Sequence, residues 1–242
     1  MKSFKYTVRR FIPPSLLALY RPLRFLSRVA LFRFSNKKQA KHFQNLILAR
    51  FPTLSESTNS GVVLDIGANV GHFSAACRNL GYTVVAVEPH PTALLSLRKR
   101  FREDSQIIIL DKAVTNDFTK VHLHMHPQHS LDPKATSIAA SIYSDKFTEE
   151  TFHVEVESTN LHQLVERYGP FEIVKVDIEG AEMLLVDDII SNHKDIGKLL
   201  METHERFMEN TSESSKYRSK LQDLNNFIRT KKLEVCWLTD WI

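Results

Sequence analysis

Apolar and polar residues follow two alternating patterns along most of the chain after residue 60. Short apolar runs, expected to be buried strands, cover residues 62–67, 82–90, 107–114, 171–180, 198–207 and 233–238. Amphipathic segments with helical spacing cover residues 72–81, 91–101, 161–169, 181–190 and 217–232. Strands that alternate with helices in this way are typical of an α/β fold with a mostly parallel central sheet and helices on both faces.

Residues 121–159 depart from this rhythm. Residues 121–126 and 152–158 alternate between apolar and polar positions, which predicts two half-buried strands around a loop rich in Ser, Ala and Thr. His122, His124 and His126 would share one face of the first strand, with His129 just beyond it. Such a row permits a zinc site, but no cysteine or acid completes a closed ligand set nearby, so we expect an ordinary half-exposed strand.

The N-terminal segment is basic. Its first 55 residues contain twelve Lys or Arg and no Asp or Glu, whereas the rest of the chain carries 20 basic and 28 acidic side chains. Arginines and apolar residues recur at helical spacing on separate faces of residues 21–34, after prolines that split the segment into two short helical pieces. We therefore expect a basic amphipathic helical arm at residues 1–55, a polar linker near residues 54–61, and one domain at residues 56–242.

Three roles stay open for this arm. Its apolar face can pack on the domain, or residues 1–34 can dock on an anionic membrane surface. Contact with nucleic acid is the least favoured role, because the aromatic residues of the arm fall on the apolar stripe of its helix.

Composition sets further limits. The 242 residues are 43% hydrophobic, enough for a sizeable core. Cys77 and Cys236 lie far apart and form no disulfide-rich pattern, which favours a reducing compartment. The apolar run after the first basic residues is short and interrupted by prolines, unlike a signal peptide, and no stretch is long enough to span a bilayer. We expect a cytoplasmic protein. Its basic arm also permits peripheral contact at the inner membrane surface.

The stretch LDIGANVG, which joins the first predicted strand to its helix, is the first candidate site. Gly67 and Gly71 permit a sharp turn and bring backbone N–H groups and a helix N-terminus to one place. The spacing GxxxG differs from the GxGxxG of dinucleotide-binding folds. Asp65 at this turn would repel a pyrophosphate and favour a ligand with cationic groups or N–H and O–H donors. S-adenosylmethionine, with its sulfonium, amino group and ribose diol, is such a ligand.

The next two predicted strands extend this site. Glu88 ends the strand at residues 82–90, where a carboxylate can accept both hydroxyls of a ribose. Asp111 to Ala113 fall at the edge of the third strand, where the adenine would lie. Only their position in the chain supports this assignment.

A second group of polar residues follows the apolar run FEIVKV. Asp177, Glu179 and Glu182 surround Gly180 at the carboxyl end of the sheet, an arrangement that is costly unless the carboxylates meet a cation, a donor-rich ligand or a proton. Glu202 and His204 come at the next strand end, and their spacing of two would place both on one face of a strand.

These stretches resemble the FkbM-type S-adenosylmethionine-dependent methyltransferases. The resemblance rests on LDIGANVGHF, VEPH, DKAV, VKVDIEGAE and LLMETHERF, and covers residues 61–207. It implies a Rossmann-like class I methyltransferase fold and O-methylation of sugars or other hydroxylated small molecules. It further implies contact with S-adenosylmethionine at Asp65, Gly67, Ala68, Asn69, Gly71, Glu88, Asp111, Ala113 and Asp177, the last beside the methyl-transfer centre.

The chain departs from this family in two places. The basic arm is not part of the family's motifs. The last predicted strand stops at LEVCWLTDWI, where this fold usually completes a longer antiparallel hairpin.

An O-methyl transfer needs a base for the acceptor proton. His204 is the first candidate, with Asp177 or Glu202 to orient it and Glu179 in the same group. In a competing scheme Asp177, Glu202 and His204 bind a divalent cation such as Mg²⁺, which lowers the pKa of the acceptor hydroxyl. The hydroxylated residues Thr136, Ser137 and Ser141 would suit a polyol acceptor.

Three other functions remain as alternatives. The first keeps S-adenosylmethionine and methylates the 2′-hydroxyl of RNA. The second is a non-catalytic module with the same fold. The presence of Asp65, Glu88, Asp177 and His204 argues against it, because a site without catalysis would be expected to lose some of them. The third, a nicotinamide-dependent oxidoreductase, is disfavoured by Asp65 and by the missing central glycine of the turn.

Overall fold

The computed structural model describes residues 36–52, 61–116, 120–127, 139–147, 152–209, 211–231 and 233–238. The predicted helical pieces of the arm and the membrane contact of residues 1–34 lie outside these ranges, as do His129, Thr136 and Ser137. Within the described ranges, no helix has both the length and the apolar character that a membrane span requires.

The central element is a six-stranded sheet in the order β10-β9-β8-β1-β2-β3. All neighbouring strands in it pair in parallel, which confirms the predicted α/β sheet. The strands are β1 (Val62–Ile66), β2 (Thr83–Val87), β3 (Ile107–Leu110), β8 (Phe171–Val176), β9 (Ile196–Met201) and β10 (Glu234–Trp237). The order reverses between β1 and β8, so this sheet is doubly wound and its switch point lies between these two strands.

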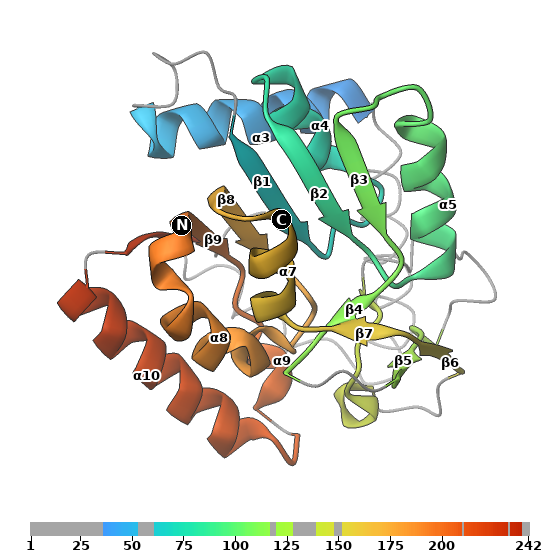
Figure 1. Ribbon diagram of the computed structural model, residues 1–242. Coiled ribbons are helices and arrows are strands. Elements are labelled where there is room, and N and C mark those ends of the chain that lie inside the picture. The colour runs from blue at the N-terminus through green and yellow to red at the C-terminus, as the bar shows by residue number, and fades with distance from the viewer. Residues whose placement is uncertain are drawn as a thin grey trace, which may run out of the picture. The chain divides into compact units, whose positions relative to one another are not determined.

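Helices cover both faces of the sheet (Figure 1), as predicted. One face packs against α3 (Asn36–Arg50), α4 (His72–Asn79) and α5 (Pro91–Arg100) through a cluster that includes Ile47, Phe73 and Leu97. The other packs against α7 (Leu161–Tyr168), α8 (Val186–Ser191) and α10 (Ser214–Lys231), with Leu161, Ile189 and Leu224 among the buried residues. Successive strand residues alternate between the two clusters, which is why the strands are mainly apolar on both faces.

Helix α3 lies within residues 1–55, for which a helical arm is predicted, although its own bounds were not predicted. Phe43, Ile47 and Phe51 recur every four residues, and Ile47 and Phe51 are buried in the same cluster as Phe73. The chain therefore contributes to the core before residue 55. The assignment of residues 1–55 to a separate arm stays a prediction.

The predicted strand at residues 107–114 is two strands. β3 ends at Leu110, the polar pair Asp111 and Lys112 follows, and β4 (Ala113–Val114) pairs with β7 (Ser158–Thr159) in a sheet of its own. The predicted half-buried strands are β5 (Val121–His124) and β6 (His153–Val156), which pair antiparallel.

Two further boundaries differ from the predictions. The segment at residues 181–190 begins as a 3₁₀ turn, η5 (Glu182–Leu185), and becomes α-helical only in α8. The strand predicted for residues 198–207 ends at Met201, and α9 (Glu205–Met208) starts four residues later. Short 3₁₀ turns η4 (Ser144–Lys146) and η6 (His193–Asp195) complete the described elements.

Candidate active site

The carboxyl ends of β1 and β8 meet at the switch point of the sheet. Ile66 pairs with Val176, and the backbone N–H of Asp177 donates to the carbonyl of Ile66 at 3.2 Å. Open α/β sheets bind ligands at this position, because the loops that leave the two strands diverge there. The glycine turn after β1 and the acidic segment after β8, predicted separately, therefore lie side by side.

The glycine turn is shaped by three residues with left-handed backbone: Gly67 (φ 77°), Asn69 (φ 49°) and Gly71 (φ 79°). The N–H groups of Gly67 and Ala68 both donate to the carbonyl of Val87, at 3.0 and 3.1 Å, which fastens the turn to the end of β2. A Cβ atom on Gly67 would lie 1.9 Å from the carbonyl oxygen of Asp177. Glycine is required there because two backbone segments approach each other closely.

Gly71 is required for a different reason. A Cβ atom at this position would lie 2.5 Å from Leu97 and 2.6 Å from Phe101, both on the α5 side of the turn. The second glycine thus allows α4 to begin tightly against α5.

Asp65 lies beneath the turn rather than on its surface. Its side chain is fully buried, accepts a hydrogen bond from the Ser74 hydroxyl at 2.6 Å, and lies 3.3 Å from the Lys175 ammonium. Lys175 also donates to the carbonyl of Gly67 at 2.8 Å and lies 3.3 Å from the carboxylate of Asp177. Burial alone would lower the pKa of Lys175, but the two aspartates raise it above its ordinary value. Lys175 therefore offsets the charge of Asp65, which weakens the electrostatic argument against a pyrophosphate.

Lys175 was not among the predicted site residues. The sequence contained a signal for it, because a lysine within the apolar end of a central strand must be paired with acids.

Glu88 lies at the end of β2 and is almost fully buried. Its Oε2 accepts from the N–H of Asn69 and its Oε1 from the N–H of His90, both at 2.7 Å. Burial raises the pKa of Glu88 to about 7, although these two backbone donors and Lys175 act in the opposite direction. Since a carboxylate offers about four lone-pair positions, Glu88 retains the capacity to accept two more donors, such as the hydroxyls of a ribose.

Asp111 and Ala113 lie farther along the same edge. Asp111 follows Leu110, whose carbonyl accepts from the N–H of Glu88, and its exposed carboxylate pairs with Arg98 at 3.4 Å. Ala113 is buried in β4, where its N–H donates to the carbonyl of Glu157 at 2.8 Å. The structure thus places Asp111 beside Glu88 and assigns Ala113 to the small second sheet.

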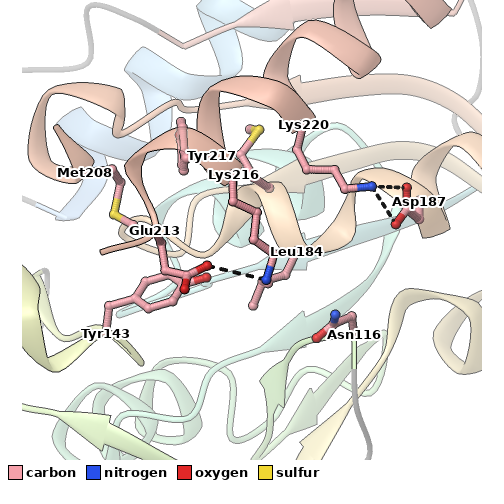
Figure 2. Close-up of a pocket in the computed structure, with 10 residues that line it drawn as sticks. Asn116, Tyr143, Leu184, Asp187, Met208, Glu213, Lys216, Tyr217 and Lys220 are labelled. Carbon is pink, nitrogen blue, oxygen red and sulfur yellow. Dashed lines mark hydrogen bonds and ion pairs between the residues drawn. The ribbon is translucent and has the colours of Figure 1, made fainter. Parts of the chain in front are cut away.

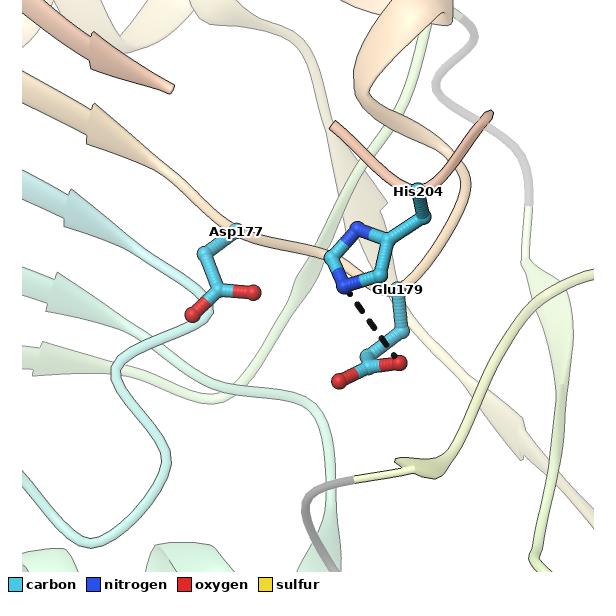
Figure 3. Close-up of side chains that lie close together, drawn as sticks. All are labelled: Asp177, Glu179 and His204. Carbon is cyan, nitrogen blue, oxygen red and sulfur yellow. Dashed lines mark ion pairs between the residues drawn. The ribbon is translucent and has the colours of Figure 1, made fainter. Parts of the chain in front are cut away.

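On the other side of the switch point, carboxylates converge on His204. Its Nε2 lies 3.6 Å from Glu179 and 3.8 Å from Glu202. One ligand atom from each of Asp177, Glu179 and His204 lies within 4.8 Å of the others (Figure 3). Among the described residues this is the one group of three or more His, Cys, Asp and Glu with that geometry.

Glu202 and His204 do not share the face of a strand, because β9 ends at Met201. Both follow in the short loop before α9, where the N–H of Glu202 still donates to the carbonyl of Val176 at 3.0 Å. That bond keeps Glu202 at the end of β8. The predicted strand is confirmed as far as Met201 and wrong beyond it, whereas the predicted proximity of the Glu202 and His204 side chains is confirmed.

Beneath His204 lies Glu182, which the sequence did not single out for a role. Glu182 is fully buried, and its Oε1 lies 2.7 Å from Nδ1 of His204 and accepts from the N–H groups of Ile178 and Gly180, both at 3.1 Å. The Tyr217 hydroxyl donates to the other oxygen at 3.3 Å and accepts from the N–H of His204 at 2.9 Å. Glu182 and Tyr217 therefore orient His204 with its Nε2 toward the other acids.

The protonation of this cluster bears on which residue acts as a base. Burial would lower the pKa of His204, but Glu182, Glu179 and Asp177 together raise it to about 10. Burial and the charge of Asp177 raise the pKa of Glu202 to about 7. In the absence of ligands His204 is a cation at neutral pH, which favours Glu202 over His204 as the proton acceptor.

The loop that carries Glu179 is held from a distant segment. Glu179 has a left-handed backbone (φ 56°), and the Ser141 hydroxyl donates to its carbonyl at 2.9 Å. Gly180 follows with φ 112°, and a Cβ atom there would lie 2.8 Å from the sulfur of Met208. Ser141, predicted to face a polyol acceptor, uses its hydroxyl to fix this backbone.

The histidines of β5 lie elsewhere. His122 is exposed while Leu123 is buried, as a half-exposed strand requires, and His153 from β6 lies with its ring centroid 4.5 Å from that of His122. His124 pairs across the strands with His153. Among the described residues, His122, His124 and His153 belong to no group of three side chains with metal-binding geometry.

A small cavity of about 110 Å³ lies beside Tyr217 (Figure 2). Its walls include Tyr143, Met183, Met208, Lys216, Tyr217 and Lys220. This volume holds a few water molecules and is too small for a nucleoside. The cavity therefore does not constitute the candidate site, and its lining contains none of Glu88, Asp177, Glu179, Glu202 and His204.

Replacing Tyr217 with phenylalanine tests the support of His204. The variant leaves the buried N–H of His204 without its acceptor, so we expect the free energy of unfolding to fall by about 1–3 kcal/mol. Urea unfolding followed by circular dichroism measures this change. Tyr143→Phe removes a hydroxyl from the same cavity wall and is the control; equal stability of the two variants would contradict the assigned role.

The comparisons with known proteins agree with this geometry. The family model described as the methyltransferase FkbM domain matches residues 65–228, a range that begins at Asp65 and includes Glu88, Asp177, Glu202 and His204. No curated protein matches the chain.

Proposed function

Because the chain belongs to the FkbM methyltransferase family, we propose that it transfers the methyl group of S-adenosylmethionine to a hydroxyl of a sugar, a glycan or a similar hydroxylated small molecule. The family makes it a methyltransferase. The methyl donor and the class of acceptor are the proposed parts.

The observation that carries the proposal is the arrangement of acids on the two sides of the switch point. Glu88 at the end of β2 retains acceptor capacity for a ribose diol. Asp177, Glu179 and Glu202 gather at the ends of β8 and β9 and suit the cationic sulfonium and amino groups. A ligand with hydroxyls at one end and positive charge at the other fits this pattern, and a dinucleotide with a central pyrophosphate fits it less well.

The chemistry is a displacement at carbon. An oxygen lone pair of the acceptor forms the bond to the methyl carbon while the carbon–sulfur bond breaks, and its electron pair stays on sulfur. Glu202 accepts the proton of the hydroxyl, since its carboxylate is partly buried at the end of β9. Lys175 holds Asp177 in place and Glu182 holds His204 in place. Fixed positions of these side chains around the reacting atoms raise the rate of methyl transfer.

Transfer of a radiolabelled methyl group tests the proposal. The full chain is incubated with methyl-labelled S-adenosylmethionine and with monosaccharides, oligosaccharides, a glycolipid in anionic vesicles, or RNA. Label on a sugar hydroxyl supports the proposal, and preference for the glycolipid would favour the membrane role of the basic arm. Label only on the 2′-hydroxyl of RNA would replace the acceptor, and no transfer to any of them would favour a non-catalytic module.

Binding of S-adenosylhomocysteine is expected to depend on the ionisation of Glu88. The pKa of about 7 lies above the ordinary value, so Glu88 is protonated below pH 7 and then accepts ribose hydroxyls poorly. The affinity should rise as the pH increases through 7 and fall up to about tenfold per pH unit below it. Lys175, which also acts on Glu88, stays charged in this range, because Asp177 and Asp65 raise its pKa.

Calorimetric titrations at pH 6, 7 and 8 measure this dependence. Glu88→Gln cannot ionise at this position, so its affinity should be lower, and it should depend less on pH than that of the wild type, with Glu202, whose pKa is also about 7, as the remaining group that titrates. If the affinity of Glu88→Gln depended on pH as strongly as that of the wild type, the pH dependence would belong to another group.

A further inference from the structure

We propose that Asp177, Glu179 and His204 bind a divalent cation, of the Mn²⁺ or Zn²⁺ type, that holds the acceptor hydroxyl. The role of the ion rests on the methyltransferase function proposed above, whereas its binding does not. The ligand set differs from the one expected from the sequence, because Glu179 takes the place of Glu202.

The three side chains come from two neighbouring strand ends. Asp177 and Glu179 follow β8, His204 follows β9, and one ligand atom of each lies within 4.8 Å of the others (Figure 3). Ligand atoms about 2.0–2.2 Å from one ion lie roughly 3 Å apart, so small side-chain rotations close the present separations. Two carboxylates and one imidazole suit Mn²⁺ or Zn²⁺ better than Mg²⁺, which prefers oxygen ligands.

His204 is oriented as a ligand would be. Its Nδ1 lies 2.7 Å from Oε1 of Glu182, which leaves Nε2 directed at Glu179, 3.6 Å away. Histidines that bind metal ions commonly donate their second ring N–H to a carboxylate in this way. Glu182 lies outside the ligand group, is fully buried, and is fixed by Tyr217 and two backbone N–H groups.

The charges around the group also call for a cation. His204 is neutral when its Nε2 binds an ion, so in the contacts of the described residues five acids meet one charged base: Asp65, Asp177, Glu179, Glu182 and Glu202 against Lys175. S-adenosylmethionine adds a single net positive charge, which leaves an excess of negative charge in a largely buried site. A divalent ion compensates this excess, as buried charges require.

The ion gives Glu202 a distinct task. A hydroxyl bound to a divalent ion has a lowered pKa and loses its proton more readily. Glu202, 3.8 Å from Nε2 of His204 and outside the ligand group, is placed to receive that proton. The cation orients and acidifies the acceptor, and Glu202 acts as the base.

Titration with Mn²⁺, followed by the electron paramagnetic resonance of free Mn²⁺, tests the site without any acceptor. The full chain is stripped with EDTA, dialysed, and titrated with and without S-adenosylhomocysteine. We expect saturable binding of one Mn²⁺ per chain, at least about tenfold weaker in Glu179→Gln and about 10–100-fold weaker in Glu182→Gln. Glu205→Gln is the matched control, since it removes the same charge next to His204 from a surface pair with Arg218 at 3.3 Å.

The outcomes separate the two proposals. No saturable binding of Mn²⁺, or equal binding by the wild type and Glu179→Gln, overturns the cation site. If S-adenosylhomocysteine still binds in calorimetry, the proposed methyl donor stands without the ion. Binding of Mn²⁺ that depends on Glu179, without binding of S-adenosylhomocysteine, supports the cation site and overturns the proposed methyl donor.

Discussion

Gly67→Ala is expected to abolish the binding of S-adenosylhomocysteine and to destabilise the protein by several kcal/mol. The new Cβ atom would lie 1.9 Å from the carbonyl oxygen of Asp177 and 2.9 Å from its carbonyl carbon, both backbone atoms that no side-chain rotation can move. A left-handed backbone (φ 77°) adds about 1–2 kcal/mol for any residue with a Cβ. The ends of β1 and β8 must therefore separate, which moves Asp177 away from the turn.

Urea unfolding and calorimetry with S-adenosylhomocysteine measure these effects. Gly61→Ala is the matched control, because its Cβ would meet only side-chain atoms, the nearest being Cβ of Glu172 at 3.2 Å. The control should bind like the wild type. If Gly67→Ala bound S-adenosylhomocysteine like the wild type, the close contact between Gly67 and the backbone of Asp177 would not be needed for the site.

Glu202→Gln is expected to lower kcat by about 10²–10⁴-fold, the usual contribution of a general base, while the affinity for S-adenosylhomocysteine changes little. The amide keeps the size of the side chain and cannot accept the hydroxyl proton. The assay uses labelled S-adenosylmethionine and the acceptor identified by methyl transfer. Glu209→Gln, which removes an exposed carboxylate 3.7 Å from Arg218, is the control. A kcat close to that of the control would remove Glu202 from the mechanism and return the role of base to another residue.

The sequence predicts the sheet well because local and tertiary preferences agree in it. Each long strand is apolar on both faces, and each helix between them has one apolar side. The split at Asp111 and Lys112 escaped prediction, since the pairing of β4 with β7 depends on a segment some 45 residues away in the chain. The packing of α3 on the sheet also escaped prediction, since Ile47 and the following Phe51 are buried in a cluster with Phe73, which is distant in the sequence.

The candidate site was predictable in its composition and less so in its roles. GANVG and DIEGAE identify the two loops, because positive φ angles and clustered carboxylates are rare without a cause. Which acid orients His204 depends on the depth of each side chain, and the fully buried position of Glu182 is set by the 3₁₀ turn that the pattern gives as a helix. The charge of His204 likewise depends on contacts between β8 and β9 that spacing along the chain does not show.

The central claim, that Glu88 and the acids after β8 form a site for S-adenosylmethionine, is tested most directly by calorimetry. The full chain is titrated with S-adenosylhomocysteine and, separately, with NAD. We expect saturable binding of one S-adenosylhomocysteine per chain and no binding of NAD. Binding of NAD, or of neither nucleotide, would contradict it.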